Sequence, residues 1–264
     1  MVIAPGIDIR RLNGDEDIST FKNFLSSDEL LDAQQTPLWL RFEWDESDEF
    51  TTSETINLVL LSLWLVKPNR VEAKLKFCIG KDQASGEKSR QRLLDRMQWI
   101  ALEEAESFST QDIALASTLF FGLCEVYRRR GRLSNAMILT MTGCWSHYWQ
   151  AALISHAAAI EAILTYSTEP GITRRLATSF ASLVEDTPDG RRTAKEHFIE
   201  LYNIRSDAMH GRVHNLEEGQ RLPSLSSFQG LLRDLWKVIL ANVQSVEALE
   251  GDDAERREFF ERLQ

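Results

Sequence analysis

A short polar stretch in the C-terminal third, YNIRSDAMHG (residues 202–211), carries residue types that are suited to chemistry. Arg205 and His210 are five residues apart, whereas Ser206 and His210 are four apart and fall on one face of a helix. A histidine ordinarily titrates near neutrality and can move protons, and a guanidinium can bind a phosphate through two hydrogen bonds. The stretch is therefore a candidate acid–base and anion-binding site.

The spacing alone proves little, because a second Arg-x4-His pair, Arg192 and His197, occurs earlier in the same helical stretch. Arg192 falls in the first turn of its predicted helix beside another arginine, which is typical of a solvated face. Arg205 lies near the end of that helix, and His210 is its last residue before a glycine, where the helix dipole favours a cation. The alternative interpretation is an ordinary helix-end ion pair and C-terminal cap.

Other candidate residues favour structural roles. His156 falls on the apolar stripe of its helix, so we expect a core or interface histidine. His214 follows His210 by four, but a glycine intervenes, so the sequence predicts no metal pair there and no cofactor elsewhere. The run Arg128–Arg130 is typical of a solvated helix end, and a local basic rim for RNA is its alternative.

Composition excludes several classes of protein. The 264 residues carry a net charge of −10, which argues against extensive binding to a nucleic-acid backbone but permits contact with a few nucleotides. The longest apolar run, Ile56–Val66, is too short to cross a membrane, and the N-terminus lacks the pattern of a signal peptide. Cys78, Cys124 and Cys144 show no CxxC spacing. We expect buried free thiols and a cytoplasmic protein with no membrane partner.

The positioning elements follow from apolar periodicity. Leu38–Trp44 and Val71–Ile79 alternate as strands do, and a buried helix is expected at Ile56–Val66, after the hydroxyl caps of residues 51–54. Helices are further predicted at 111–130, 134–166, 172–184, 191–210 and 228–249. A turn is predicted at 187–190, Pro223 opens the last helical region, and a charged tail ends the chain. The fold class is mainly α, with a small α+β region at 1–107 and a helical bundle at 108–264.

Two segments of the chain resemble a known family. RSDAMHG, preceded by ELYNI, is similar to the Arg-x4-6-His motif of the HEPN superfamily. AAAIEAILTYS (157–167) resembles a helix of its ApeA-like branch, in which an acidic residue stands in an apolar run, and LLSLWLVKPNRVE resembles that branch's N-terminal region. The resemblance covers about residues 40–245 and is strongest at 150–170 and 198–213.

The resemblance implies a HEPN-like up-down helical bundle that dimerises and cleaves RNA without a metal. Arg205 and His210 match its catalytic pair, Glu161 matches the acidic residue that holds the arginine, and Ser206 stands at its polar position. The residues themselves agree with this pairing, since a carboxylate among alanines and isoleucines is costly unless it is paired, and Arg205 is the natural partner. A two-fold dimer would bring two arginines and two histidines into one cleft.

The predicted function is thus a homodimeric endoribonuclease that contacts a few RNA nucleotides, with His210 as general acid/base and Arg205 on the scissile phosphate. By analogy the setting is bacterial defence or toxin-like RNA cleavage, with a trigger or regulatory partner acting on the N-terminal region. A non-catalytic binding or scaffold module with the same fold is the alternative. A third hypothesis is a partner of a nucleotidyltransferase.

Overall fold

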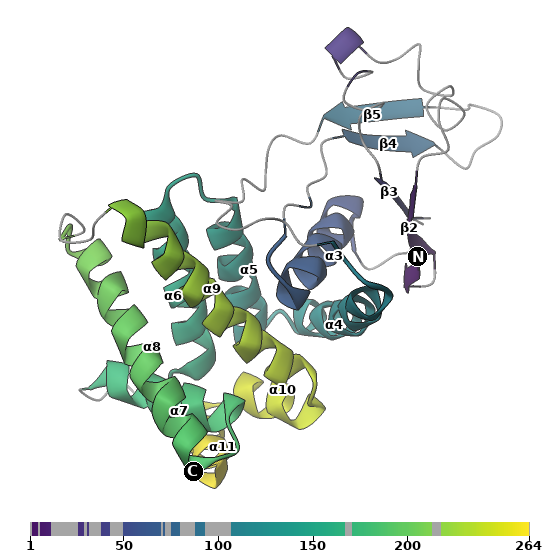
Figure 1. The fold of residues 1–264 in the computed structure, drawn as a ribbon. Helices are drawn as coiled ribbons and strands as arrows, with labels where there is room; N and C mark the ends of the chain where they lie inside the picture. Colours follow the sequence, from purple (N-terminus) through teal and green to yellow (C-terminus); the bar gives the residue numbers. More distant parts are fainter. Residues whose placement is uncertain are drawn as a thin grey trace. The chain divides into compact units, whose positions relative to one another are not determined.

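The fold is mainly α with a smaller N-terminal α+β part, as predicted (Figure 1). A computed structural model of the chain describes residues 2–4, 6–11, 26–28, 31, 38–42, 50–69, 71, 75–79, 88–92, 107–166, 171–212 and 218–263. The chain divides into two compact units, one of residues 1–60 and 71–96, and one of residues 61–70 and 97–264.

The first unit contains two antiparallel sheets. In the first sheet, β2 (Ile7–Arg11) lies between β1 (Val2–Ala4) and β3 (Leu38–Phe42), and in the second β4 (Leu75–Ile79) pairs with β5 (Lys88–Arg92). Strands were predicted where β3 and β4 lie, although Val71 is not part of β4. Strands β2 and β5 were not predicted, because IDIRR contains only two alternating apolar residues and KSRQR contains none.

The helix α3 (Thr52–Val66) begins four residues before the predicted start. The Thr51 hydroxyl accepts the Glu54 backbone N–H at 3.3 Å, and the Glu54 carboxylate accepts the Thr51 backbone N–H at 2.8 Å. This reciprocal capping box confirms the expected hydroxyl cap. The helix ends just before Pro68, which cannot continue it.

The second unit is a helical bundle. Its helices are α4 (Thr110–Arg129), α5 (Arg132–Trp145), α6 (Trp149–Leu164), α7 (Ile172–Val184), α8 (Pro188–Met209), α9 (Glu218–Leu240), α10 (Val243–Glu250) and α11 (Asp253–Leu263). Helix α5 packs against α6 and α7 against α8, while α9 crosses the bundle and contacts α4, α6, α7 and α8 (Figure 1). No helix within the described ranges is long and apolar enough to span a membrane.

The predicted single helix over 134–166 is wrong, because the chain turns between α5 and α6. Ser146 and Tyr148 adopt extended backbone angles, and the Ser146 hydroxyl donates to the Thr142 carbonyl at 2.9 Å. Apolar residues continue on both sides of this turn, with neither proline nor glycine at 146–148, so the pattern gave no sign of it. The turn lets α6 fold back on α5.

The predicted turn at 187–190 is also wrong. Thr187 is the N-cap of α8 and its hydroxyl accepts the Gly190 N–H at 3.1 Å, while Pro188 occupies the first turn. Proline is favoured there because its missing N–H would have no helical partner. The same letters that indicate a turn therefore also begin a helix.

Three further boundaries near the C-terminus differ from the predictions. Pro223 lies inside α9, which begins at Glu218, instead of opening the helical region. The predicted helix 228–249 is interrupted after Leu240, and Asn242 caps α10 by accepting the Gln244 N–H at 2.9 Å. The charged tail forms α11, because it buries the side chains of Arg256 and Phe260.

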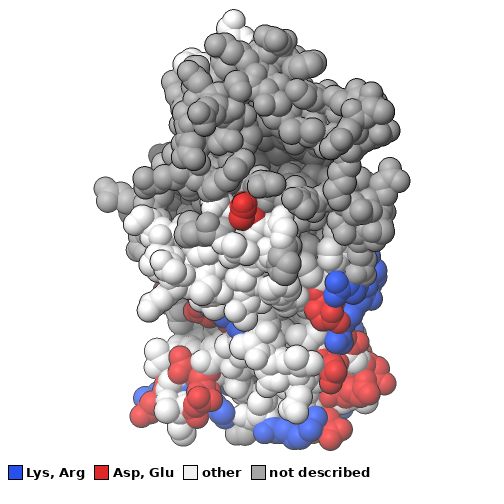
Figure 2. Space-filling view, turned by 90° about the vertical axis from the view of Figure 1, so that its right-hand side faces the viewer, with Lys and Arg blue, Asp and Glu red and all other residues white. Residues whose placement is uncertain are grey.

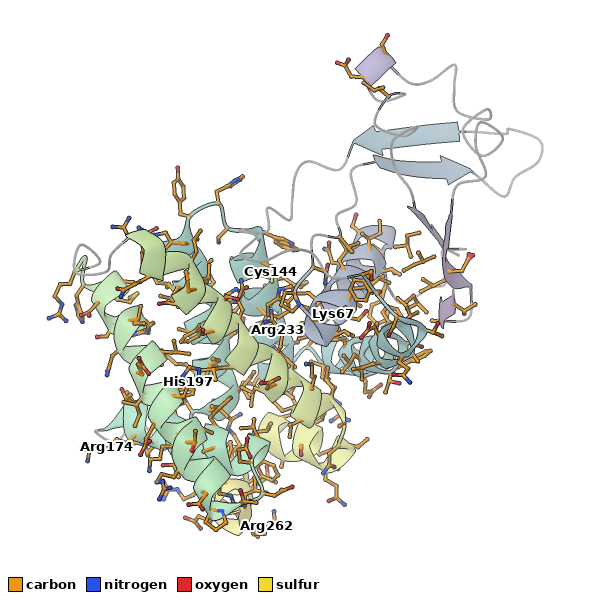
Figure 3. The ribbon with its side chains drawn as sticks, viewed as in Figure 1. Lys67, Cys144, Arg174, His197, Arg233 and Arg262 are labelled. Carbon is orange, nitrogen blue, oxygen red and sulfur yellow. The ribbon has the colours of Figure 1, made fainter. Side chains whose placement is uncertain are left out.

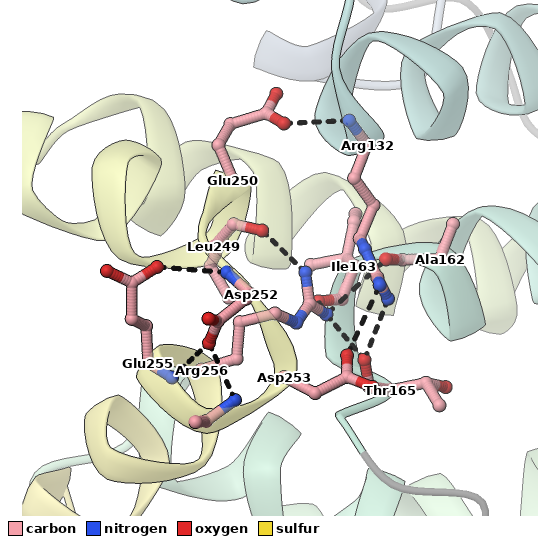
Figure 4. Close-up of polar contacts among 11 residues, drawn as sticks. Arg132, Ala162, Ile163, Thr165, Leu249, Glu250, Asp252, Asp253, Glu255 and Arg256 are labelled. Atoms are coloured by element: carbon pink, nitrogen blue, oxygen red, sulfur yellow. Dashed lines mark hydrogen bonds and ion pairs between the residues drawn. The ribbon is translucent and has the colours of Figure 1, made fainter.

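Arg256 connects α11 to two other helix ends (Figure 4). Its guanidinium is fully buried and donates to the carbonyl oxygens of Leu249, Ile163 and Thr165, the last at 2.8 Å. These carbonyls lie at the C-terminal ends of α10 and α6, where no intrahelical donor is available. Burial lowers the pKa of Arg256 to about 10, so the guanidinium remains charged at neutral pH.

Glu250 provides a second long-range cap (Figure 4). Its carboxylate accepts the backbone N–H groups of Arg132 at 2.7 Å and Leu133 at 3.1 Å, at the N-terminus of α5. The residue before the helix is Gly131, where an added Cβ would lie 2.0 Å from Glu250 Oε2. A side chain at position 131 would push the Glu250 carboxylate away, so glycine leaves room for this distant carboxylate to replace the local cap.

His156 is a core residue, as predicted. It is fully buried, its ring stacks on Trp64 with centroids 5.9 Å apart, and its Nε2 lies 3.2 Å from Gln229 Nε2. A Cβ on Gly143 would meet its ring at 2.4 Å, so this glycine lets α6 approach α5 closely. Burial, with the nearby Arg233 charge adding to it, lowers the pKa of His156 to about 3. The histidine is therefore neutral at physiological pH.

Cys124 and Cys144 are buried and form no disulfide, which confirms that part of the cysteine prediction. Burial raises the pKa of the Cys144 thiol, against the opposing charge of Arg233; both residues are labelled in Figure 3. The side chain of Cys78 lies outside the described part of the chain.

Candidate functional site

Helices α6 and α8 pack together and carry the predicted site residues. On α6, Glu161 follows the fully buried Ile160 and is itself only half-buried. On α8, Phe198 and Tyr202 are buried on the bundle side, and Arg205 lies one turn after Tyr202. Burying these apolar positions turns Glu161 and Arg205 toward each other across the two helices.

The expected pairing of Glu161 with Arg205 is present. Arg205 Nη2 donates to Glu161 Oε1 at 2.7 Å, and the side chains are 22% and 26% exposed respectively. A half-buried ion pair of this kind is less screened by water than a surface pair. The pairing places a fixed cation at this position, and its role in catalysis remains a prediction.

Tyr202 is the site residue that sequence reasoning missed. Its hydroxyl donates to the same Glu161 Oε1 that Arg205 contacts, and the Arg205 Cζ lies 5.3 Å from the centre of its ring. Burial and the bond to Glu161 together raise the pKa of Tyr202, so it remains a donor. The available signal was its spacing of three residues from Arg205, which puts both on one helix face.

Only part of the Arg205 guanidinium is occupied. Its Nε is buried and has no hydrogen-bond partner, and its Nη1 makes no hydrogen bond to any residue in the described part of the chain. The guanidinium can therefore still offer N–H groups at its outer end, while Glu161 holds one side.

His210 lies in the open at the C-terminal end of α8. Its backbone N–H donates to the Ser206 carbonyl at 3.1 Å, and Gly211 follows with a left-handed φ of 70°. Glycine adopts such a φ without strain, so the predicted closure of the helix by Gly211 is confirmed. The imidazole is exposed, and Ser206 is half-buried. Within the described residues, no hydrogen bond joins the side chains of Arg205, Ser206 and His210.

The second Arg-x4-His pair lies on a solvated helix face, as the sequence predicted. Arg192 is 69% exposed and pairs with Asp189 at 3.1 Å, in the first turn of α8. His197 is exposed (Figure 3). Arg128 is likewise exposed and pairs with Glu125 at 2.8 Å, as expected of a solvated helix end. His214 lies outside the described residues.

The surface charges of the described residues are mixed. On the face shown in Figure 2, lysines and arginines stand among aspartates and glutamates, and they do not form one broad basic area. This agrees with the net charge of −10 and with contact to few phosphates at most. Within the described ranges, no three His, Cys, Asp or Glu side chains gather as a metal site would require.

Fold and site define a mainly α, two-unit protein with a tyrosine–carboxylate–guanidinium cluster between two bundle helices. No protein-family model, curated protein or solved structure matches the chain. The residues of this cluster are therefore the basis for inferring its function.

Proposed function

We propose that this chain is a metal-independent endoribonuclease of the HEPN type that acts as a homodimer. The observation that supports this proposal best is the bond between Glu161 and Arg205. These residues are 44 positions apart and belong to the two segments on which the resemblance depends. The sequence alone predicts this pairing, whereas a helix-end arginine has many other possible partners.

In the proposed reaction the 2′-hydroxyl of the RNA attacks the adjacent phosphorus, and the bond from phosphorus to the 5′-oxygen breaks. One imidazole removes the proton of the 2′-hydroxyl and another supplies a proton to the leaving oxygen. The guanidinium of Arg205 stabilises the charge that develops on the phosphate oxygens. His210 is exposed on each chain, and a dimer would supply the second histidine.

The biological setting in this proposal is RNA cleavage in bacterial defence or toxin action, in the cytoplasm. The N-terminal unit would receive the trigger or regulatory partner. Both points come from analogy with the family that the sequence resembles.

The test compares cleavage of labelled single-stranded RNA in EDTA by the wild type, His210→Ala and His197→Ala. His197 is the matched control, since it is an exposed histidine of the other Arg-x4-His pair on the same helix. We expect cleavage by the wild type and His197→Ala, and at least a 100-fold loss in folded His210→Ala. Cleavage that disappears in EDTA, or survives in His210→Ala, would reject this mechanism.

A second candidate is a non-catalytic binding or scaffold module of the same fold. The mixed charges of the face in Figure 2 favour it, as does the lack of a hydrogen bond between the Arg205 and His210 side chains among the described residues. This candidate predicts no cleavage by the wild type on any RNA tested, together with unchanged oligomeric state in His210→Ala.

A further inference from the structure

We propose that Tyr202 is a positioning residue that keeps the outer end of the Arg205 guanidinium open for a phosphate. The inference rests on the proposed function, because it concerns how the same arginine is presented to its anion. It also makes a prediction about phosphate binding that does not need RNA cleavage.

One carboxylate oxygen of Glu161 is shared by two donors. Glu161 Oε1 accepts the Tyr202 hydroxyl and also Arg205 Nη2, the latter at 2.7 Å. Carboxylates beside a guanidinium commonly form two parallel hydrogen bonds, one from each oxygen. Here a single hydrogen bond, from Nη2 to Oε1, joins Arg205 to Glu161, and the Tyr202 hydroxyl bonds that same oxygen.

The ring of Tyr202 is held rigidly by its aromatic neighbours. Its ring stacks on Phe198 with centroids 5.7 Å apart and planes 14° apart, and Phe198 packs against Phe180 at 5.2 Å. Tyr202 is only 4% exposed. Its hydroxyl therefore holds Glu161 from a fixed point in the core, while the other face of the cluster meets solvent.

Some N–H groups of the Arg205 guanidinium remain available to a ligand. Its Nε is buried, so the side-on edge of the guanidinium formed by Nε and Nη2 is closed to a ligand. Nη1 and one N–H of Nη2 remain unbonded within the described residues, and Nη1 and Nη2 form the end-on fork that can bind two phosphate oxygens. If both Glu161 oxygens bonded Nη1 and Nη2, they would occupy this fork.

Tyr202→Phe keeps the stacked ring and removes only the hydroxyl. The released carboxylate is then free to bond Arg205 with both oxygens, so we expect phosphate affinity to fall about tenfold. In RNA cleavage the same variant should raise KM more than it lowers kcat. The double variant Tyr202→Phe/Glu161→Gln removes the competing charge and should regain wild-type affinity or exceed it. A merely structural role of Tyr202 predicts no such recovery.

The experiment titrates the full chain with inorganic phosphate and follows the guanidinium NMR signal of Arg205, which is assigned by its loss in Arg205→Lys. Tyr166→Phe is the control, because that ring also stacks on a phenylalanine, Phe260, at 5.4 Å. Thermal unfolding shows whether each variant is folded.

Weaker binding in Tyr202→Phe with recovery in the double variant supports the inference. Equal affinity in the wild type and Tyr202→Phe would overturn it, as would the absence of phosphate binding at Arg205 in the wild type. If the phosphate results hold but the wild type cleaves no RNA, the proposed nuclease is rejected and the role of Tyr202 stands. If the wild type cleaves RNA but Tyr202→Phe binds phosphate as the wild type does, the proposed nuclease stands and the role of Tyr202 is rejected.

Discussion

Replacing Arg256 by methionine would remove the guanidinium that joins α11 to the ends of α6 and α10. Methionine keeps much of the side-chain volume, so the cost comes mainly from carbonyls that lose a charged donor. Arg256 donates to the carbonyls of Leu249, Ile163 and Thr165. A hydrogen bond to a charged group contributes about 1.5–3 kcal/mol, so three such bonds would total roughly 5–9 kcal/mol.

Part of this gain is offset in the wild type by the cost of burying the charge. The pKa of Arg256 falls from 12.5 to about 10, which corresponds to about 3 kcal/mol. We therefore expect Arg256→Met to lower the free energy of unfolding by about 2–6 kcal/mol. In a unit of this size that corresponds to a decrease in Tm of about 4–24 °C.

The assay is thermal and urea unfolding followed by circular dichroism. The matched control is Arg257→Met, because Arg257 is the next residue on α11 and is exposed. We expect that control to remain within about 0.5 kcal/mol of the wild type. If Arg256→Met changes the free energy of unfolding by less than 1 kcal/mol, or no more than the control does, the assignment of these hydrogen bonds as stabilising is refuted.

Two other predictions concern the core. Gly143→Ala places a Cβ 2.4 Å from the His156 ring, so we expect it to lower the free energy of unfolding by about 1–3 kcal/mol. In Gly230→Ala the added Cβ meets nothing within 4 Å, so we expect it to raise the free energy of unfolding by about 0.5–1 kcal/mol. Urea unfolding measures both changes. The folded-state pKa of His156 is about 3, below the usual 6.5, so the unfolded chain takes up a proton first. Stability should therefore fall by up to about 1.4 kcal/mol per pH unit as pH decreases from 6.5 toward 3. His156→Gln should reduce that slope while His197→Gln leaves it unchanged, and equal slopes would contradict the assignment.

The sequence predicted those features that local rules determine. The hydroxyl cap at the start of α3 follows from the residue types at 51–54 before an apolar run, and the structure contains it at Thr51. Glu161 and Arg205 could be paired in advance because an isolated carboxylate in an apolar helix needs a cation. The buried His156 followed from its place on an apolar stripe.

Features that depend on distant residues could not be predicted. The charged segment of α11 looked like a tail, because two of the carbonyls that accept from Arg256 lie at the end of α6, about 90 residues earlier. The turn between α5 and α6 was missed because their apolar patterns join without a break. The role of Tyr202 was missed because its hydroxyl partner, Glu161, lies 41 residues away on α6.

The long-range caps also bear on the order in which the bundle can form during synthesis. The N-terminus of α5 is capped by Glu250, 118 residues downstream, and the end of α6 receives Arg256, 91 residues after Thr165. A ribosome extends a chain by roughly 5–20 residues per second, so helices α5 and α6 are synthesised about 5–24 s before these partners. During that interval their polar ends depend on water, and the nascent chain is open to proteases or chaperones. Completion of α10 and α11 would then close the bundle in a single late event.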